Sequence, residues 1–151
     1  MSRTRLLVIL ILILSAFLAA ALYPSEKKRI RKVISGCREA LAREDLEGIM
    51  EHLSFSFSSE YGGGYLQTKK RAELMFRRFD GFEVTADVMN IIIDRDRAEA
   101  DLKVLVTARQ GSEPVHLAGD AMGPDDIRLF LEKSPYDWKI IGIERTGQAD
   151  Y

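Results

Sequence analysis

The sequence predicts an α+β fold that follows an N-terminal transmembrane helix, and three observations support this. A run without charged side chains extends from Leu6 to Leu22. Apolar residues then recur every three or four positions up to about Leu53, which is typical of helices. From Phe82 onward apolar and polar residues alternate, which is typical of strands. Because the helices are grouped before most of the strands, the pattern favours α+β over alternating βαβ units.

The first 23 residues are predicted to be a signal anchor or transmembrane helix. At about 1.5 Å per residue, Leu6–Leu22 would span roughly 26 Å, close to the ~30 Å hydrocarbon core of a bilayer. Tyr23 suits the membrane interface. The alternative is a cleaved signal peptide, with Arg3 and Arg5 as its basic start and Ala19–Ala21 as its cleavage site. The apolar run is long for a signal peptide, so we favour the uncleaved anchor.

The charges around this segment give two opposing indications of the side of the membrane on which the domain lies. Two arginines precede the apolar run, and five basic residues follow it closely: Lys27, Lys28, Arg29, Arg31 and Lys32. The positive-inside rule would keep the following domain in the cytoplasm, whereas a very short basic N-terminal tail is typical of exported chains. The basic residues could also lie against anionic headgroups on either face. We expect a single-pass protein and favour an extracytoplasmic domain.

Composition limits the remaining possibilities. The chain has 151 residues and a formal net charge of -1, so no global basicity indicates nucleic acid binding. After the leader, residues 25–145 are enough for one domain, with a tail at 146–151. Cys37 is the sole cysteine, which excludes an intramolecular disulfide. Its spacing places it on the apolar side of a helix, where thiols usually pack.

Three helices are expected in the domain. Ser25 is suited to cap the first, which carries Ile30, Ile34 and Leu41 on one stripe. Asp45 is suited to cap a second, shorter helix. Thr68 is suited to cap a third, which should end near Asp80–Gly81.

Strands are expected before and after this third helix. Ser54–Ser59 alternates serine with phenylalanine, so its two phenylalanines should share one face. The parity of the alternation changes near Val88–Asn90, which indicates either a bulge or a strand covered on both faces. Alternation is clearest from Ala98 to Ala108. Further strands are expected at residues 115–118, 127–131 and 138–143, joined as an antiparallel meander.

These elements resemble the nuclear transport factor 2-like superfamily, which includes ketosteroid isomerases and polyketide cyclases. The resemblance covers roughly residues 25–145. It is carried by the helix end at Ala40–Met50, the hairpin at Ile91–Ala100 and the closing segment at Trp138–Ile143. These are structural positions and not catalytic signatures. The resemblance implies a cone, with a curved antiparallel sheet wrapped around helices and an apolar pocket at its wide end.

The resemblance also implies which side chains line this pocket or its core. Dimerisation through the sheet face is common in this superfamily, and we expect that it is available here. The expected lining residues are Phe55, Phe57, Met75, Phe76, Phe79, Leu102, Val104, Trp138 and Ile140. Tyr61 and Tyr65 flank the glycine loop and are candidates for a lid over the pocket, with incidental packing of the loop as the alternative that we favour.

No catalytic set, cofactor site or metal site is predicted. His52 is the one candidate acid or base, although a lone histidine beside an apolar stripe is more often a partly buried structural residue. Scattered histidines and one cysteine do not form a metal-ligand set. Asp94 and Asp96 begin like a calcium loop, but no glycine follows at the sixth position. Gly62–Gly64 lacks the lysine of a phosphate loop.

The sequence therefore favours a membrane-tethered, non-enzymatic domain that binds a small apolar ligand or a partner protein. One alternative is an isomerase, dehydratase or cyclase that uses an aspartate, tyrosine or histidine in the pocket. Another is an accessory factor of an envelope complex.

Overall fold

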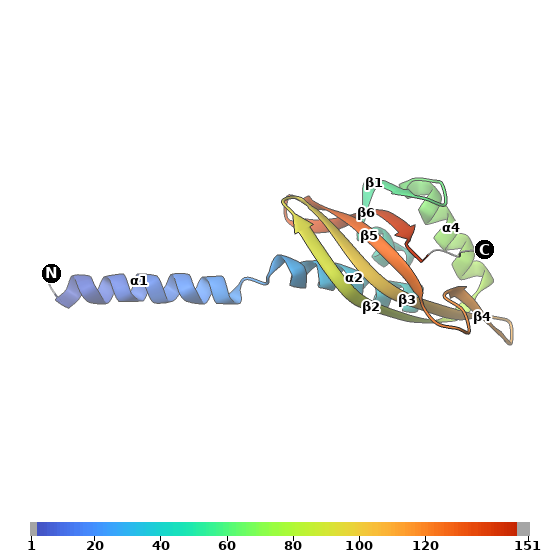
Figure 1. The fold of residues 1–151 in the computed structure, drawn as a ribbon, viewed down its shortest axis with the longest axis horizontal. Helices are drawn as coiled ribbons and strands as arrows, with labels where there is room; N and C mark the ends of the chain where they lie inside the picture. The colour runs from blue at the N-terminus through green and yellow to red at the C-terminus, as the bar shows by residue number, and fades with distance from the viewer. Residues whose placement is uncertain (1–2, 148–151) are drawn as a thin grey trace.

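A computed structural model describes residues 3–147 of the chain, and within this range it has four helices and six strands (Figure 1). The helices are α1 (Arg3–Leu22), α2 (Glu26–Ala42), α3 (Leu46–Met50) and α4 (Tyr65–Arg78). The strands are β1 (Leu53–Ser59), β2 (Asp80–Asp94), β3 (Arg97–Gln110), β4 (Glu113–Ala118), β5 (Asp125–Ser134) and β6 (Asp137–Arg145). Residues 148–151 of the expected tail lie outside the described range.

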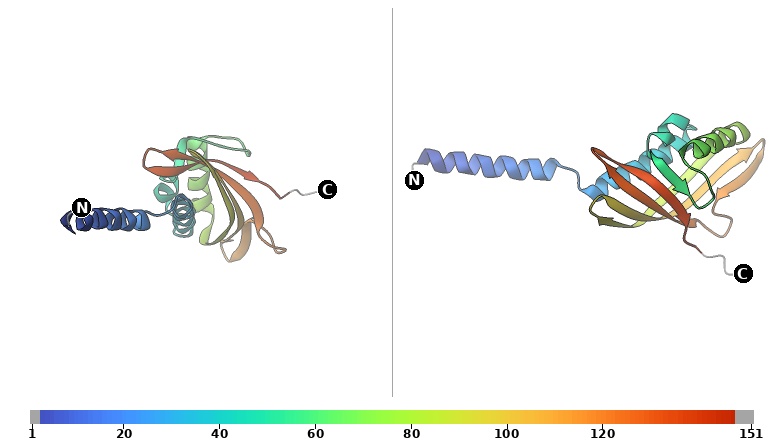
Figure 2. Two further views of the ribbon diagram at one scale, coloured as in Figure 1. Left: turned by 60° about the vertical axis from the view of Figure 1, so that its left-hand side comes forward. Right: turned by 90° about the horizontal axis from the view of Figure 1, so that it is seen from above.

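Helix α1 projects away from the rest of the molecule (Figures 1 and 2). Its large apolar side chains from Leu6 to Leu22 are exposed, with Leu14 at 69% and Phe17 at 78%. Within the described residues, one helical stretch is long and apolar enough to cross a membrane. A helix of 20 residues has a length of about 30 Å, which matches the thickness of a bilayer core.

The first two helices of the domain begin at the predicted caps. The side chain of Ser25 accepts a hydrogen bond from the backbone amide of Lys28 at 3.3 Å. The carboxylate of Asp45 accepts one from the amide of Gly48 at 3.0 Å. Each cap satisfies an amide that the helix itself leaves without a partner.

The prediction that Thr68 caps the third helix is wrong. Helix α4 begins at Tyr65, and Gly64 precedes it without a side-chain cap. The amide of Thr68 donates to the carbonyl of Gly64 at 3.0 Å, so Thr68 already belongs to the first turn. The sequence rule failed because a glycine in extended backbone can precede a helix without offering any capping side chain.

The sheet is mixed, which corrects the expectation of an antiparallel one. Its order is β1-β6-β5-β3-β2, and β4 pairs with β3. The neighbours β2–β3, β3–β4, β3–β5 and β5–β6 are antiparallel, whereas β1 and β6 are parallel. Periodicity cannot show this direction, because β1 reaches β6 through several intervening elements and no hairpin connects the two.

Irregularities interrupt the pairing register of two strands, β1 and β2. The register of β2 shifts between Val88 and Asn90, where a bulge was one of the two interpretations of the sequence. Strand β1 shifts register between Leu53 and Ser58. The two phenylalanines of β1 differ in burial: Phe57 is 6% exposed, whereas Phe55 is 87% exposed.

The sheet curves around α2, and the hydrophobic core lies between them (Figure 2). Ile30 of α2, Leu131 of β5 and Trp138 of β6 are among its most deeply buried side chains. A second, smaller cluster forms around Phe82 where α4 covers one end of the sheet. Phe76 of α4 meets Phe82 edge to face, with ring centroids 5.3 Å apart. This arrangement leaves space over the inner face of the sheet beside the second half of α2.

Candidate ligand-binding cavity

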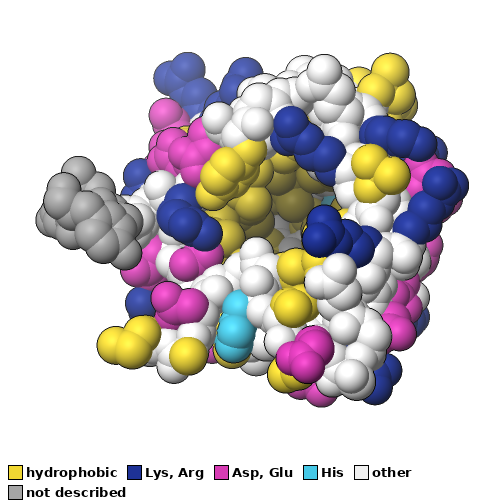
Figure 3. Space-filling model, turned by 90° about the vertical axis from the view of Figure 1, so that its right-hand side faces the viewer, with side chains coloured by type: hydrophobic (Ala, Val, Ile, Leu, Met, Phe, Trp, Pro, Cys, Tyr) yellow, Lys and Arg dark blue, Asp and Glu magenta, His cyan; other side chains and the backbone are white. Residues whose placement is uncertain are grey.

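An apolar cavity of about 190 Å³ lies between the second half of α2 and the inner face of the sheet. The end of the domain that lies away from α1 is hollowed over an apolar floor (Figure 3). The lining comes from α2, β1, β2, β3, β5 and β6, so most of the fold contributes to its shape. The lining residues are Ile34, Cys37, Arg38, Leu41, Leu53, Phe57, Val84, Ala86, Leu102, Val104, Val106, Ile127, Leu129, Ile140 and Ile143.

Fourteen of these fifteen residues are apolar, and Arg38 is the one charged member. Its guanidinium has one ion pair among the described residues, with Glu39 at 3.9 Å. Cys37 also lines the cavity, and burial raises the pKa of its thiol to about 11. A thiol with such a pKa is neutral at physiological pH and is a poor nucleophile. The described lining therefore includes neither a carboxylate nor an imidazole for acid–base chemistry.

The cavity volume limits the size of what it can hold. An engineered apolar cavity of about 150 Å³ stays dry and binds benzene. Typical small-molecule pockets are larger, at about 300–1,000 Å³. A volume of about 190 Å³ therefore suits an apolar group of roughly one aromatic ring or a short hydrocarbon chain.

The structure brings four of the expected lining residues together in this cavity: Phe57, Leu102, Val104 and Ile140. The other expected residues lie elsewhere. Phe55 is exposed and contacts Tyr65, with ring centroids 4.8 Å apart. Tyr61 is 58% exposed in the loop before α4. The three apolar residues of α4 and its end, Met75, Phe76 and Phe79, pack on the second cluster. Trp138 is buried in the core at 2% exposure and lines a different cavity.

Most of the cavity wall was missed by the sequence reasoning about the site. Ile34, Cys37 and Leu41 come from α2, and Val84 and Ala86 come from β2. The signal was present, because the α2 residues form one helical stripe and the β2 residues alternate in one strand. What the sequence could not supply was the packing that sets this stripe opposite this face of the sheet.

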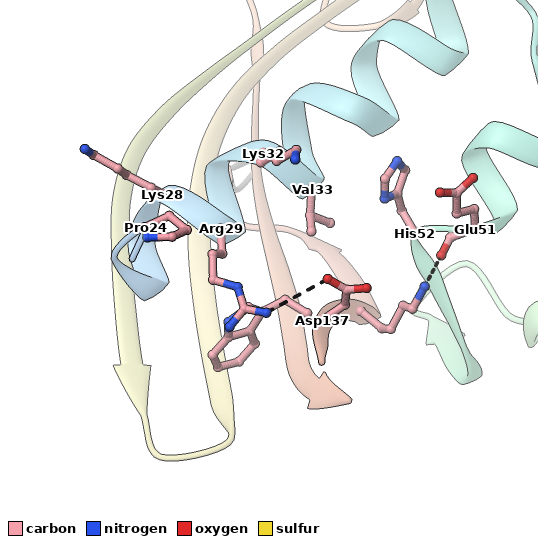
Figure 4. A pocket seen from close by; sticks show the side chains of 10 residues that line it. Pro24, Lys28, Arg29, Lys32, Val33, Glu51, His52 and Asp137 are labelled. Carbon is pink, nitrogen blue, oxygen red and sulfur yellow. Dashed lines mark hydrogen bonds and ion pairs between the residues drawn. The ribbon is translucent and has the colours of Figure 1, made fainter. Parts of the chain in front are cut away.

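A second, polar cavity of about 330 Å³ lies at the opposite end of α2, beside Pro24 (Figure 4). We call it the basic cleft. It is lined by Pro24, Lys28, Arg29, Lys32, Val33, Glu51, His52, Asp137, Trp138 and Lys139.

His52, the candidate acid or base, lies in this basic cleft and is absent from the lining of the apolar cavity. Its ring packs closely on α2 at Gly36. A β-carbon at Gly36 would be 2.6 Å from Nε2 of His52, so a larger residue there would displace the ring. Burial lowers the pKa of His52, which favours its neutral form.

Within the described residues, no group of three or more histidine, cysteine, aspartate or glutamate side chains is placed to hold a metal ion.

No protein-family model matches the chain, and no curated protein matches it. Solved structures do. A protein of unknown function with a cystatin-like fold from Nostoc punctiforme is 17% identical, with a TM-score of 0.64 and coverage of 82% of this chain and 92% of that one. An NTF-2 like protein of unknown function from Shewanella oneidensis is 16% identical, with a TM-score of 0.59 and coverage of 79% and 97%.

Two further structures extend this comparison. A protein proposed to be a scytalone dehydratase, from Novosphingobium aromaticivorans, is 20% identical, with a TM-score of 0.62 and coverage of 83% and 87%. Bd1075 from Bdellovibrio bacteriovorus is 14% identical with a TM-score of 0.62, and the match spans 82% of this chain but 41% of that longer one. Likeness at these identities shows the fold, and the chain therefore has the nuclear transport factor 2-like, cystatin-like fold.

Proposed function

We propose that the chain is a membrane-tethered domain that binds a small apolar ligand in the cavity beside α2. The observation that carries this proposal is the lining itself, with fourteen apolar side chains around about 190 Å³ of space. The cavity opens to solvent at the hollowed end of the domain (Figure 3), so its apolar side chains are partly in contact with water. A ligand of about one ring would displace this water and bury apolar surface.

The proposed tether rests on α1. Its apolar side chains are exposed all round, whereas a helix of this composition in a soluble domain would be buried. Insertion into a bilayer would remove these side chains from water, and its length matches a hydrocarbon core.

The ligand-binding proposal can be tested with toluene as the probe and the full-length chain in lipid nanodiscs. A ligand that binds only the folded state at one hundred times its Kd adds about 2.7 kcal/mol to the unfolding free energy. We expect toluene to raise the urea midpoint of the wild type. The variant Ala86→Leu, which fills the cavity, should show little or no increase.

Ala121→Leu is the matched control, because Ala121 is exposed in the turn before β5 and lies outside the cavity. It should respond to toluene like the wild type. An unchanged urea midpoint in the wild type, or an equal increase in Ala86→Leu, would contradict binding in this cavity.

A dehydratase-like or isomerase-like enzyme is the second candidate, and the likeness to the Novosphingobium protein favours it. Such chemistry would need an acid or base near the ligand, and His52 is the candidate that the sequence offers. Because His52 lies in the basic cleft, a substrate would have to bind there instead of in the apolar cavity. Turnover of an enolisable ketone that is lost in His52→Ala would support this candidate.

A partner-binding role, including homodimerisation or service to an envelope complex, is a third possibility. Met89 and Ile92 of β2 are 60% and 56% exposed, so an edge strand of the sheet presents apolar side chains. Cross-linking in intact cells that captures a partner through β2, and loses it in Met89→Lys, would favour this role over ligand binding.

A further inference from the structure

The basic cleft lies where α2 begins, and three residues separate this point from the end of α1. Pro24, which follows Leu22 by two residues, is part of its lining. If α1 spans a bilayer, the lining residues nearest Pro24 stand at the level of the lipid headgroups. In that case the basic cleft lies beside the membrane surface.

The charge balance of the basic cleft is positive. Four lysine or arginine side chains line it against two carboxylates, those of Glu51 and Asp137. Arg29 points toward Asp137, with 4.0 Å between guanidinium and carboxylate, and also donates to the carbonyl of Tyr136 (Figure 4). Lys139 donates to the backbone carbonyl of Glu51, so its charge is not neutralised by this contact.

Lys28 and Lys32 are the two cations of the cleft whose ammonium groups form no hydrogen bond and no ion pair among the described residues. They lie four residues apart on one side of α2, and within the described residues neither has an ion pair within 4.0 Å. In Figure 4 Lys28 extends outward past Pro24, away from the Arg29–Asp137 pair. Both lysines also line an adjoining cavity, which Arg31 and Glu39 border as well.

We propose that the basic cleft binds the phosphate of an anionic phospholipid headgroup, with Lys28 and Lys32 as its main contacts. Two unpaired ammonium groups beside a membrane span attract the single negative charge of a phosphodiester, and basic residues near an anionic surface strengthen membrane binding. A headgroup bound there would fix how the domain stands on the bilayer. The inference rests on the proposed tether but is independent of the apolar cavity.

The chain offers an internal reporter for this site, because Trp138 is its sole tryptophan and lines the cleft. Its indole donates to the carboxylate of Glu26 at 2.6 Å. A phosphate near Lys28 and Lys32 would change the electric field at this ring and shift its emission. The test follows Trp138 fluorescence of the full-length chain in phosphatidylcholine nanodiscs that contain an increasing fraction of phosphatidylglycerol.

We expect a saturable shift for the wild type. The double variant Lys28→Gln/Lys32→Gln should need a roughly 30-fold higher fraction of phosphatidylglycerol for half of the shift, or show none. The charge-matched control Lys69→Gln/Lys70→Gln, on α4, should behave like the wild type. A curve for Lys28→Gln/Lys32→Gln that coincides with the wild type would overturn the proposal, as would an equal loss in the control.

Two further results separate the possible causes of failure. Inorganic phosphate added to discs of pure phosphatidylcholine should leave the emission unchanged; the same shift with phosphate alone would assign the site to a free anion and overturn the lipid proposal. A chain that does not co-elute with the discs would contradict the tether itself, before any headgroup is considered.

Discussion

Helix α2 serves two different environments along its length. Its first half carries Lys28 and Lys32 into a polar cleft beside the end of α1. Its second half carries Ile34, Cys37 and Leu41 into an apolar cavity over the sheet. The buried core around Ile30 lies along the same helix. One amphipathic element thus places a charged site beside the end of α1 and an apolar site against the inner face of the sheet.

The two sites also differ in how the fold stabilises them. Side chains of the basic cleft are held by hydrogen bonds and ion pairs, including those of Arg29 and Lys139. The apolar cavity is shaped only by packing, because its lining offers almost no polar groups. Substitutions that change side-chain volume should therefore affect the apolar cavity most. Substitutions that change charge or hydrogen bonding should affect the basic cleft most.

The largest effect on the unfolding free energy is expected in the packed core, and it can be compared with the cavity wall on the same strand. Leu131 of β5 is fully buried in the core, and Leu129 two residues earlier is half-buried beside the cavity. Leu131→Ala should lower the unfolding free energy by about 3 kcal/mol. Leu129→Ala should cost about 1–2 kcal/mol, because fewer contacts surround it. Urea denaturation measures both losses of unfolding free energy. Equal losses would contradict the looser packing around Leu129.

The next effect concerns the reactivity of Cys37 in the cavity wall. Its thiol has a pKa of about 11 against an ordinary 9.0. The thiolate population at neutral pH should therefore be about 100-fold smaller than in an unfolded chain. The rate of alkylation should rise about tenfold for each pH unit until the pH approaches the pKa. A rate that levels off near pH 9 would contradict the buried environment of this thiol.

A smaller effect on the unfolding free energy is expected for Gly36→Ala, beside the basic cleft, and its sign should depend on whether His52 is present. Gly36→Ala alone should destabilise the fold by about 1 kcal/mol, because the new β-carbon would collide with His52. In a His52→Ala background the same change should stabilise by about 0.8–1 kcal/mol, since alanine favours the helix over glycine. A double-mutant cycle in urea measures this coupling, and additive effects would contradict the contact.

The smallest effect is expected at Glu26. Hydrogen bonds from Trp138 and Lys133 lower the pKa of its carboxyl below the ordinary 4.5. Its stabilising contribution should therefore be present above pH 4.5 and decline as the pH falls through the lowered pKa. Because its side chain is 39% exposed, Glu26→Gln should cost at most about 1 kcal/mol at neutral pH. The difference from wild type should vanish in acid, and a difference independent of pH would contradict the ionic contribution.

The sequence predicted the helical caps at Ser25 and Asp45 and the α+β order, because both depend on local chemistry and periodicity. It did not predict that β1 runs parallel to β6, since strand direction in a non-local pair depends on the whole path of the chain. The family resemblance placed Phe55 in the pocket, whereas its ring is exposed in the structure, because the resemblance does not fix how far each side chain of β1 is covered. The cavity itself follows from imperfect packing between elements, which no local pattern encodes.

The most direct test of ligand binding in the apolar cavity is the alkylation rate of Cys37 by N-ethylmaleimide, with and without saturating toluene. Cys37 is the sole cysteine and lines the cavity, so the signal reports this site alone. Binding predicts that toluene slows alkylation of the folded chain at least tenfold and leaves the rate in urea unchanged. An alkylation rate of the folded chain that toluene does not change would contradict the proposed ligand-binding function.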